Sequence, residues 1–150
     1  MSTSSGTTNG TTEAGGARAI RVLVVDDSAP VRDLVMVNLE LEGFEVRTAA
    51  DGLEGFEVAA QWQPDLITLD VVMPRLDGFG ALERLRADPR TADIPVVILT
   101  GRAQGADRDR GLALGADAYL SKPFEPAELV GVVNDLARSG RRAGERGPGR

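Results

Sequence analysis

Three aspartates stand where runs of apolar residues stop. Asp26 and Asp27 follow the run at 20–25, and Asp70 follows the run at 66–69. Histidine and cysteine are absent from the 150 residues, which excludes imidazole and thiolate metal sites, serine–histidine triads and cysteine nucleophiles. A carboxylate is therefore the candidate nucleophile, and any bound metal must take oxygen ligands, as Mg²⁺, Mn²⁺ and Ca²⁺ do.

Two more polar residues come at the ends of apolar runs. Thr100 follows the run at 95–99, and Lys122 comes shortly after the run at 118–120. Lys122 is the only lysine among 17 basic residues, which indicates that its compact ammonium is needed in a chain that otherwise uses arginine. We expect Asp70 to attack phosphorus and form an acyl phosphate, with Lys122 neutralising one phosphoryl oxygen and Thr100 donating a hydrogen bond to another.

These charges favour a bound cation. Three carboxylates in one crevice repel each other, and without compensation at least one of them would be protonated near neutral pH. Asp26, Asp27 and Asp70 with Lys122 leave a formal charge of −2, which one Mg²⁺ would cancel. Each residue alone has an ordinary explanation, since Asp26 and Asp27 fit a turn or helix cap and Thr100 fits a strand end. Their joint occurrence at four strand ends is much harder to explain in this way.

The elements that must position these residues alternate along the chain. Apolar runs predict five strands, and helical spacing with capping residues predicts five helices. The strands are expected at 20–25, 44–48, 66–69, 95–99 and 118–120, and the helices at 28–43, 51–62, 78–87, from about Gln104 to 115, and from 126. This alternation predicts an α/β fold with a doubly wound parallel sheet, in which the carboxyl ends of the strands share one side. The run at 44–48 has no polar end and is expected at the edge of the sheet.

Composition divides the chain into three parts. Residues 1–18 predict a disordered leader, residues 19–138 one domain, and residues 139–150 a flexible basic tail. Without the tail, which has four Arg against one Glu, and the leader, in which Glu13 balances Arg18, the formal charge of −6 becomes −9 on the domain. That charge favours proteins or cations over nucleic acid as partners. No run is long enough to span a membrane, and the absence of cysteine fits a cytoplasmic protein.

Five motifs occur together and in one order. They are Val24-Val25-Asp26-Asp27-Ser28, the stretch from Asp70 to Gly78, Leu99-Thr100, Gly115-Ala116-Asp117-Ala118-Tyr119-Leu120 and Ser121-Lys122-Pro123-Phe124. With this combination, residues 19–138 closely resemble the receiver domain of two-component response regulators. The resemblance implies a flavodoxin-like (CheY-like) sheet with strand order 2-1-3-4-5. It also implies that Asp70 accepts a phosphoryl group from the phosphohistidine of a sensor kinase or from a phosphotransfer protein.

The same resemblance implies a metal site and a switch. Mg²⁺ would be held by Asp26, directly or through water, and by Asp27, Asp70 and the backbone carbonyl of Val72.

Thr100 and Tyr119 would form the family's switch pair, and the Lys122–Pro123 peptide bond would be cis. Phosphorylation would then change a protein-binding surface at about 104–138. We expect a stand-alone receiver, monomeric or dimerising on phosphorylation, that binds a downstream protein and neither nucleic acid nor membrane. The 12 residues after Arg138 are too few for an output domain.

Two other functions stay open. A Mg²⁺-dependent phosphatase of the haloacid dehalogenase type also uses an aspartyl nucleophile on an α/β sheet, but it expects a second aspartate where this chain has Val72. A phosphorylation-dead scaffold is the other alternative, although all the acceptor-site residues are present. Three positions depart from common receiver patterns: Val72 and Arg102, which bear on phosphoryl lifetime, and Val132, where the winged-helix transcription-factor branch often carries a pairing arginine.

Overall fold

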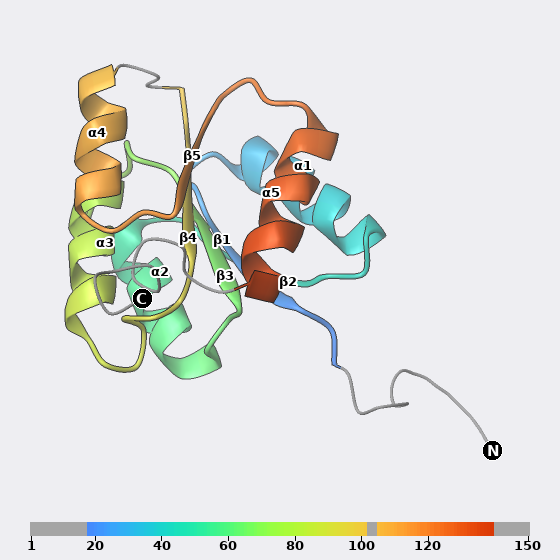
Figure 1. Ribbon diagram of the computed structural model, residues 1–150, viewed down its shortest axis with the longest axis horizontal. Coiled ribbons are helices and arrows are strands. Elements are labelled where there is room, and N and C mark those ends of the chain that lie inside the picture. The colour runs from blue at the N-terminus through green and yellow to red at the C-terminus, as the bar shows by residue number, and fades with distance from the viewer. Residues whose placement is uncertain (1–17, 102–104, 140–150) are drawn as a thin grey trace.

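The computed structural model describes residues 18–101 and 105–139, which form a parallel sheet between two layers of helices (Figure 1). The five strands lie in the order β2-β1-β3-β4-β5, so the predicted order is confirmed. Their bounds are Arg21–Val25 for β1, Glu45–Ala49 for β2, Leu66–Leu69 for β3, Val96–Thr100 for β4 and Ala118–Ser121 for β5. As expected, β2 lies at one edge of the sheet.

The helices cover both faces of the sheet. Their bounds are Ala29–Leu41 for α1, Gly52–Trp62 for α2, Gly78–Ala87 for α3, Gly105–Ala113 for α4 and Pro126–Ser139 for α5. Figure 1 shows α1 and α5 on one side of the sheet and α2, α3 and α4 on the other. Each side has its own apolar cluster: Val35, Leu39 and Leu129 belong to the first, and Phe79 and Leu82 to the second. Burial on both faces explains why the central strands are continuous apolar runs.

Three of the helices begin directly after a capping residue. The side chains of Ser28, Asp51 and Asp77 each accept a hydrogen bond from a backbone N–H in the first turn of the helix that follows. Gly43 and Gly115, which follow α1 and α4, have φ angles of +93° and +109°, a conformation that glycine adopts at little cost.

Several boundaries differ from expectation by one or two residues. Strand β2 begins at Glu45 rather than Phe44, because the Phe44 N–H donates to the carbonyl of Leu39 at the end of α1 instead of joining the sheet. Thr100 is the last residue of β4 rather than the residue after it. The predicted start of α4 at Gln104 lies outside the described residues, as do most of the predicted leader and tail. Within the described part of the chain, no helix has the length and apolar character needed to cross a bilayer.

Candidate functional site

Strand register brings the polar strand ends to one crevice. Val25 pairs with Leu69, so Asp26 and Asp70 follow adjacent positions on neighbouring strands. The backbone N–H of Asp70 donates to the carbonyl of Val25 at 2.9 Å. On the other side of β4, the N–H of Lys122 donates to the carbonyl of Thr100, also at 2.9 Å. The sheet therefore places these residues side by side although they are far apart in sequence.

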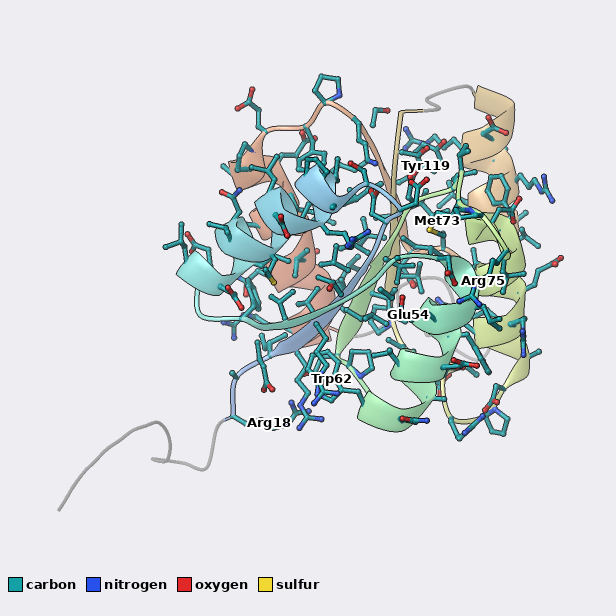
Figure 2. All side chains as sticks on the ribbon, turned by 180° about the vertical axis from the view of Figure 1, so that it is seen from behind. Arg18, Glu54, Trp62, Met73, Arg75 and Tyr119 are labelled. Carbon is teal, nitrogen blue, oxygen red and sulfur yellow. The ribbon has the colours of Figure 1, made fainter. Side chains whose placement is uncertain are left out.

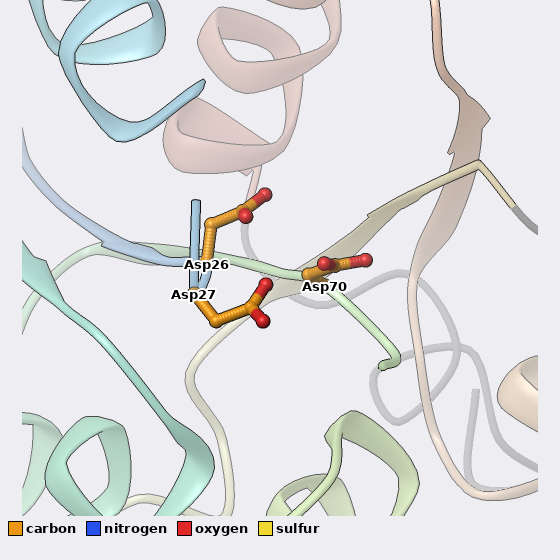
Figure 3. Close-up of side chains that lie close together, drawn as sticks. All are labelled: Asp26, Asp27 and Asp70. Carbon is orange, nitrogen blue, oxygen red and sulfur yellow. The ribbon is translucent and has the colours of Figure 1, made fainter. Parts of the chain in front are cut away.

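Three carboxylates gather at this point, as Figure 3 shows. One oxygen from each of Asp26, Asp27 and Asp70 lies within 4.8 Å of the other two. Asp26 and Asp70 are buried, whereas Asp27 is exposed. Oxygen ligands in this arrangement suit a hard divalent cation that keeps part of its water shell.

Lys122 directly follows β5, and its side chain lies beside two of these carboxylates. Its Nζ atom lies 2.6 Å from Oδ2 of Asp26 and 3.6 Å from Oδ2 of Asp70. The ammonium therefore balances part of the negative charge, as its position at a strand end predicted. The peptide bond that follows it, Lys122–Pro123, is cis, in agreement with the expectation drawn from the resemblance.

The carboxyl of Asp70 is in an unfavourable environment for its charged form. Burial raises the pKa of Asp70, and the neighbouring charge of Asp26 raises it further. The ammonium of Lys122, the N–H of Val71 and a hydrogen bond with the Thr100 side chain lower that pKa, but they do not offset the increase. A divalent cation beside Asp70 would favour its charged form and would balance the formal charge of −2 on Asp26, Asp27, Asp70 and Lys122.

The loop between β3 and α3 contains Val72, whose backbone carbonyl is predicted to be a metal ligand. Val72 lies two residues after Asp70, and its side chain is exposed. The loop returns to the end of β3, where the N–H of Gly78 donates to the carbonyl of Val71, the residue after Asp70, at 2.8 Å. A Cβ atom on Gly78 would lie 2.1 Å from the carbonyl oxygen of Asp70, so this close approach requires glycine. The sequence predicts that a helix starts at this residue but does not predict this contact.

The two predicted switch residues lie on adjacent strands. Thr100 is buried at the end of β4 and hydrogen-bonds to Asp70. Tyr119 is half-buried in β5, where it pairs with Ile98 and packs against the apolar cluster formed with α2, α3 and α4. Met73 belongs to the same apolar cluster, and both residues are labelled in Figure 2.

Comparison with known proteins decides the family. The family model described as the response regulator receiver domain matches residues 22–134. The chain belongs to this family. Receiver domains of this family act in two-component signalling, so the expectation drawn from the sequence motifs is confirmed.

Individual relatives show how far the likeness extends. The chain is 48% identical over 118 residues to the DNA-binding dual master transcriptional regulator RpaA of Synechocystis, covering 79% of this chain and 49% of that protein. Among solved structures, the receiver fold aligns with chemotaxis protein CheY4 of Vibrio cholerae at a TM-score of 0.75 and 34% identity, covering 79% of this chain and 99% of the other. The receiver domain of sensor histidine kinase PA1611 from Pseudomonas aeruginosa, solved with a magnesium ion in its active-site cleft, aligns at a TM-score of 0.75 and 30% identity, covering 81% and 99%. The chain thus spans about half the length of the curated relatives it matches and nearly all of the receiver structures.

Proposed function

We propose that Asp70 is the phosphoacceptor of this receiver domain and that a sensor histidine kinase or a phosphotransfer protein is its donor. The observation that carries the proposal is the placement of the Asp70 carboxylate at the end of β3, beside two further carboxylates and within 3.6 Å of the Lys122 ammonium. No histidine or cysteine in the chain competes as nucleophile. In the transfer, a carboxylate oxygen of Asp70 forms a bond to phosphorus while the bond from phosphorus to the donor imidazole nitrogen breaks, and the imidazole keeps that electron pair.

The surrounding residues would bind the transferred group and the metal. Asp26, Asp27, Asp70 and the Val72 carbonyl would hold Mg²⁺, which supplies positive charge against the phosphoryl oxygens when bound. The geometry supports this assignment because the three side chains offer oxygens within 4.8 Å of one another. The magnesium ion in the related receiver of PA1611 is further support.

Two side chains would stabilise the phosphoryl oxygens directly. Lys122 would neutralise one oxygen as a point charge, and the Thr100 hydroxyl would donate a hydrogen bond to another. Both groups already lie beside Asp70: Lys122 at 3.6 Å, and Thr100 through a hydrogen bond. This chemistry forms one acyl phosphate per chain without turnover of a substrate, which distinguishes it from the phosphatase alternative.

A groove next to the crevice would receive the donor protein. Val31 and Leu34 of α1 face Pro123 and Phe124 across a hollow of about 360 Å³, and Lys122 forms part of its wall. The Leu34 side chain is 53% exposed, so apolar surface lies open beside the site of phosphorylation. An apolar helix face of the donor would dock there and bring its phosphohistidine to Asp70.

Phosphorylation would be transmitted through a second surface. We assign this output to α4, β5 and α5, within residues 105–138, where Tyr119 joins the crevice to the helices. Its partner would be a downstream protein, because the domain carries a net formal charge of −9 that opposes direct contact with nucleic acid.

Control of transcription is a second candidate for the protein that carries this domain. The relative RpaA is described as a DNA-binding transcriptional regulator, and the present chain corresponds to 49% of its length. The prediction that nucleic acid is not a partner therefore applies to the receiver domain alone and not to a longer protein that carries it. An electrophoretic mobility assay with the 150-residue protein should show no DNA binding with or without phosphorylation.

Intact mass spectrometry tests the acceptor assignment. Incubation with acetyl phosphate and Mg²⁺ should add one phosphoryl group to the wild-type protein and none to Asp70→Asn. Omission of Mg²⁺ should slow the reaction strongly. If Asp70→Asn gains the group at the wild-type rate, another residue is the acceptor.

A further inference from the structure

The loop between β3 and α3 contains a backbone conformation that needs support. Arg75 has a φ angle of +67°, in the left-handed region that residues other than glycine rarely adopt. Such a conformation is unfavourable for an L-residue and persists where surrounding contacts enforce it. The contacts made by Arg75 and its neighbours therefore decide where this loop lies.

Two contacts fasten this part of the loop to the start of α2. The Arg75 side chain binds Asp51, with Nε and Nη2 each 2.9 Å from Oδ2. Next to this ion pair, the N–H of Gly52 donates to the carbonyl of Leu76 at 3.0 Å. A Cβ atom on Gly52 would lie 2.1 Å from that carbonyl oxygen, so the two backbones touch. Figure 2 shows Arg75 beside Glu54 at the N-terminal end of α2.

Asp51 is itself held firmly. Its Oδ1 atom caps α2 by accepting the N–H of Glu54 at 2.9 Å, and the Glu54 side chain accepts the N–H of Ala50 at 2.8 Å. Just before this turn, the carbonyl of Ala49 accepts the N–H of Asp26 at 3.1 Å. The ion pair thus joins the loop to a hydrogen-bonded turn that directly follows a backbone contact with Asp26.

The fastened loop carries the Val72 carbonyl. At one end of the loop, the N–H of Val71 donates to Oδ1 of Asp70 at 2.8 Å. At the other end, the Arg75–Asp51 pair is the side-chain anchor. Val72 lies between these two contacts. A movement of the Arg75 backbone would therefore also move the Val72 carbonyl relative to the carboxylates.

We infer that Arg75 is a positioning residue, whose ion pair with Asp51 holds the Val72 carbonyl in register with the carboxylates of Asp26, Asp27 and Asp70 for binding a divalent cation. The inference rests on the proposed function of this crevice. Arg75 itself contacts neither the cation nor the phosphoryl group. It acts through the backbone between it and Asp70, as outer-shell partners orient the ligands of other metal sites.

Mg²⁺ affinity measured by isothermal titration calorimetry tests the inference with two variants that break the pair from opposite sides. Arg75→Ala removes the guanidinium. Asp51→Asn removes the charge but keeps an oxygen that can cap α2. Each variant should weaken Mg²⁺ binding by about threefold to tenfold. This loss is at or below the lower end of the effects known for outer-shell partners of metal ligands, because the Arg75 side chain is partly exposed to solvent. The double variant should lose no more than either single one, since both break one interaction.

A comparison of Mg²⁺ affinity with the rate of phosphorylation distinguishes a positioning role of Arg75 from a general disturbance of the fold. Phosphorylation by acetyl phosphate should be slower in Arg75→Ala at low Mg²⁺ and should return to the wild-type rate when Mg²⁺ saturates. The matched control is Arg90→Ala, because Arg90 pairs with Asp88 at 2.8 Å and is 58% exposed, against 59% for Arg75. That pair lies beyond the C-terminal end of α3, away from the crevice, so Mg²⁺ affinity should not change.

The possible outcomes separate this inference from the proposed function. Unchanged Mg²⁺ affinity in Asp51→Asn, or an equal loss in Arg90→Ala, would overturn the role of Arg75 while leaving the metal site in place. A wild-type protein that binds no Mg²⁺ would overturn the proposed function. Melting temperatures measured without Mg²⁺ show that each variant is folded, and Asp51→Asn carries the test alone if Arg75→Ala does not fold.

Discussion

The Nζ atom of Lys122 lies 2.6 Å from Oδ2 of Asp26. The same ammonium is 1.0 Å farther from the nearest oxygen of Asp70, at 3.6 Å. The lysine is thus bound to a metal-ligand candidate rather than to the proposed phosphoacceptor. On phosphorylation, the growing negative charge on Asp70 would draw the ammonium toward the phosphoryl oxygens, a short move for a flexible four-carbon side chain.

The first prediction concerns the shape of the cationic group at position 122. Lys122→Arg should keep the fold but weaken the response to phosphorylation, because a planar guanidinium cannot reproduce the contacts of a point charge in the same space. Amide NMR spectra with beryllofluoride and Mg²⁺, a phosphoryl mimic, measure the response. Chemical shift changes of equal size in variant and wild type would show that charge alone suffices.

The second prediction follows from the environment of Asp70. Its pKa is raised in the folded state, first by burial and then by Asp26, so the folded protein holds this proton more tightly than the unfolded chain does. Ionisation of Asp70 therefore costs stability as the pH rises from the ordinary value of 3.8 through the raised pKa. Without Mg²⁺, Asp70→Asn should melt at a higher temperature than wild type at pH 7, and the difference should shrink as the pH falls toward 3.8.

Addition of Mg²⁺ should reverse that order. Binding to the folded state alone stabilises it by about 2.7 kcal/mol at a concentration one hundred times the dissociation constant, and Asp70→Asn lacks one ligand. A thermal shift that is as large in Asp70→Asn as in wild type would argue against Asp70 as a ligand. Chelation with EDTA should restore the metal-free melting temperatures of both proteins.

A third prediction concerns an ion pair that lies outside the crevice. Arg86 of α3 pairs with Asp117 at 3.1 Å, where the aspartate side chain is fully buried. The same guanidinium donates to the carbonyls of Ala92, Ile94 and Gly115. Arg86→Ala should lower the free energy of unfolding by about 3–5 kcal/mol, because it removes the cationic partner of a buried carboxylate and leaves the N–H of Val96, at 3.0 Å, to donate to it.

The control for Arg86 is its neighbour Arg84. Arg84 is exposed and stacks over the ring of Phe56 at 4.7 Å, so Arg84→Ala should cost only about 0.5–1 kcal/mol. Urea denaturation of both variants provides the comparison. Similar losses in the two proteins would show that burial of Asp117 does not amplify the effect.

These residues mark the limit of what the sequence could predict. The crevice was predictable because Asp26, Asp70 and Lys122 end apolar runs, and parallel strands bring their carboxyl ends together. The partners of Arg86 were not predictable, since most of them are backbone carbonyls in loops, and any residue type supplies such a carbonyl. The Arg75–Asp51 pair was not predictable for a related reason. An aspartate at the start of the helix expected at 51–62 suits a helix cap, and spacing along the chain says nothing about a second partner.

A fourth prediction uses two glycines with opposite surroundings. At Gly78 an added Cβ would overlap the Asp70 carbonyl oxygen at 2.1 Å, whereas at Gly131 in α5 nothing lies within 4 Å. Gly131→Ala should stabilise the domain by about 0.5–1 kcal/mol through helix propensity. Gly78→Ala should destabilise it by about 1–3 kcal/mol and should slow phosphorylation, because the overlap displaces the backbone of the acceptor. Wild-type phosphorylation in Gly78→Ala would show that the crevice tolerates this displacement.

The last prediction is that the effect of phosphorylation at Asp70 is transmitted through Thr100 and Tyr119 to the output surface formed by α4, β5 and α5. An acyl phosphate changes the charge at Asp70 from −1 to about −2, which strengthens its attraction for the Thr100 hydroxyl. The shift of Thr100 leaves space that the ring of Tyr119 can enter from the adjacent strand. Tyr119 also lies close to α4, since a Cβ on Gly111 would be 3.7 Å from its ring, so a move of the ring changes what the helix packs against.

The coupling need not be complete for the switch to work. A differential interaction of about 1–3 kcal/mol leaves part of the unphosphorylated population in the active form. With beryllofluoride and Mg²⁺, amide shifts in wild type should extend from the crevice to residues 105–138, whereas in Thr100→Ala and in Tyr119→Ala they should stay near Asp70. Because both variants keep the carboxylates, each should still bind Mg²⁺. If wild-type shifts remain confined to the crevice, or reach residues 105–138 equally in both variants, the signal does not pass through this pair.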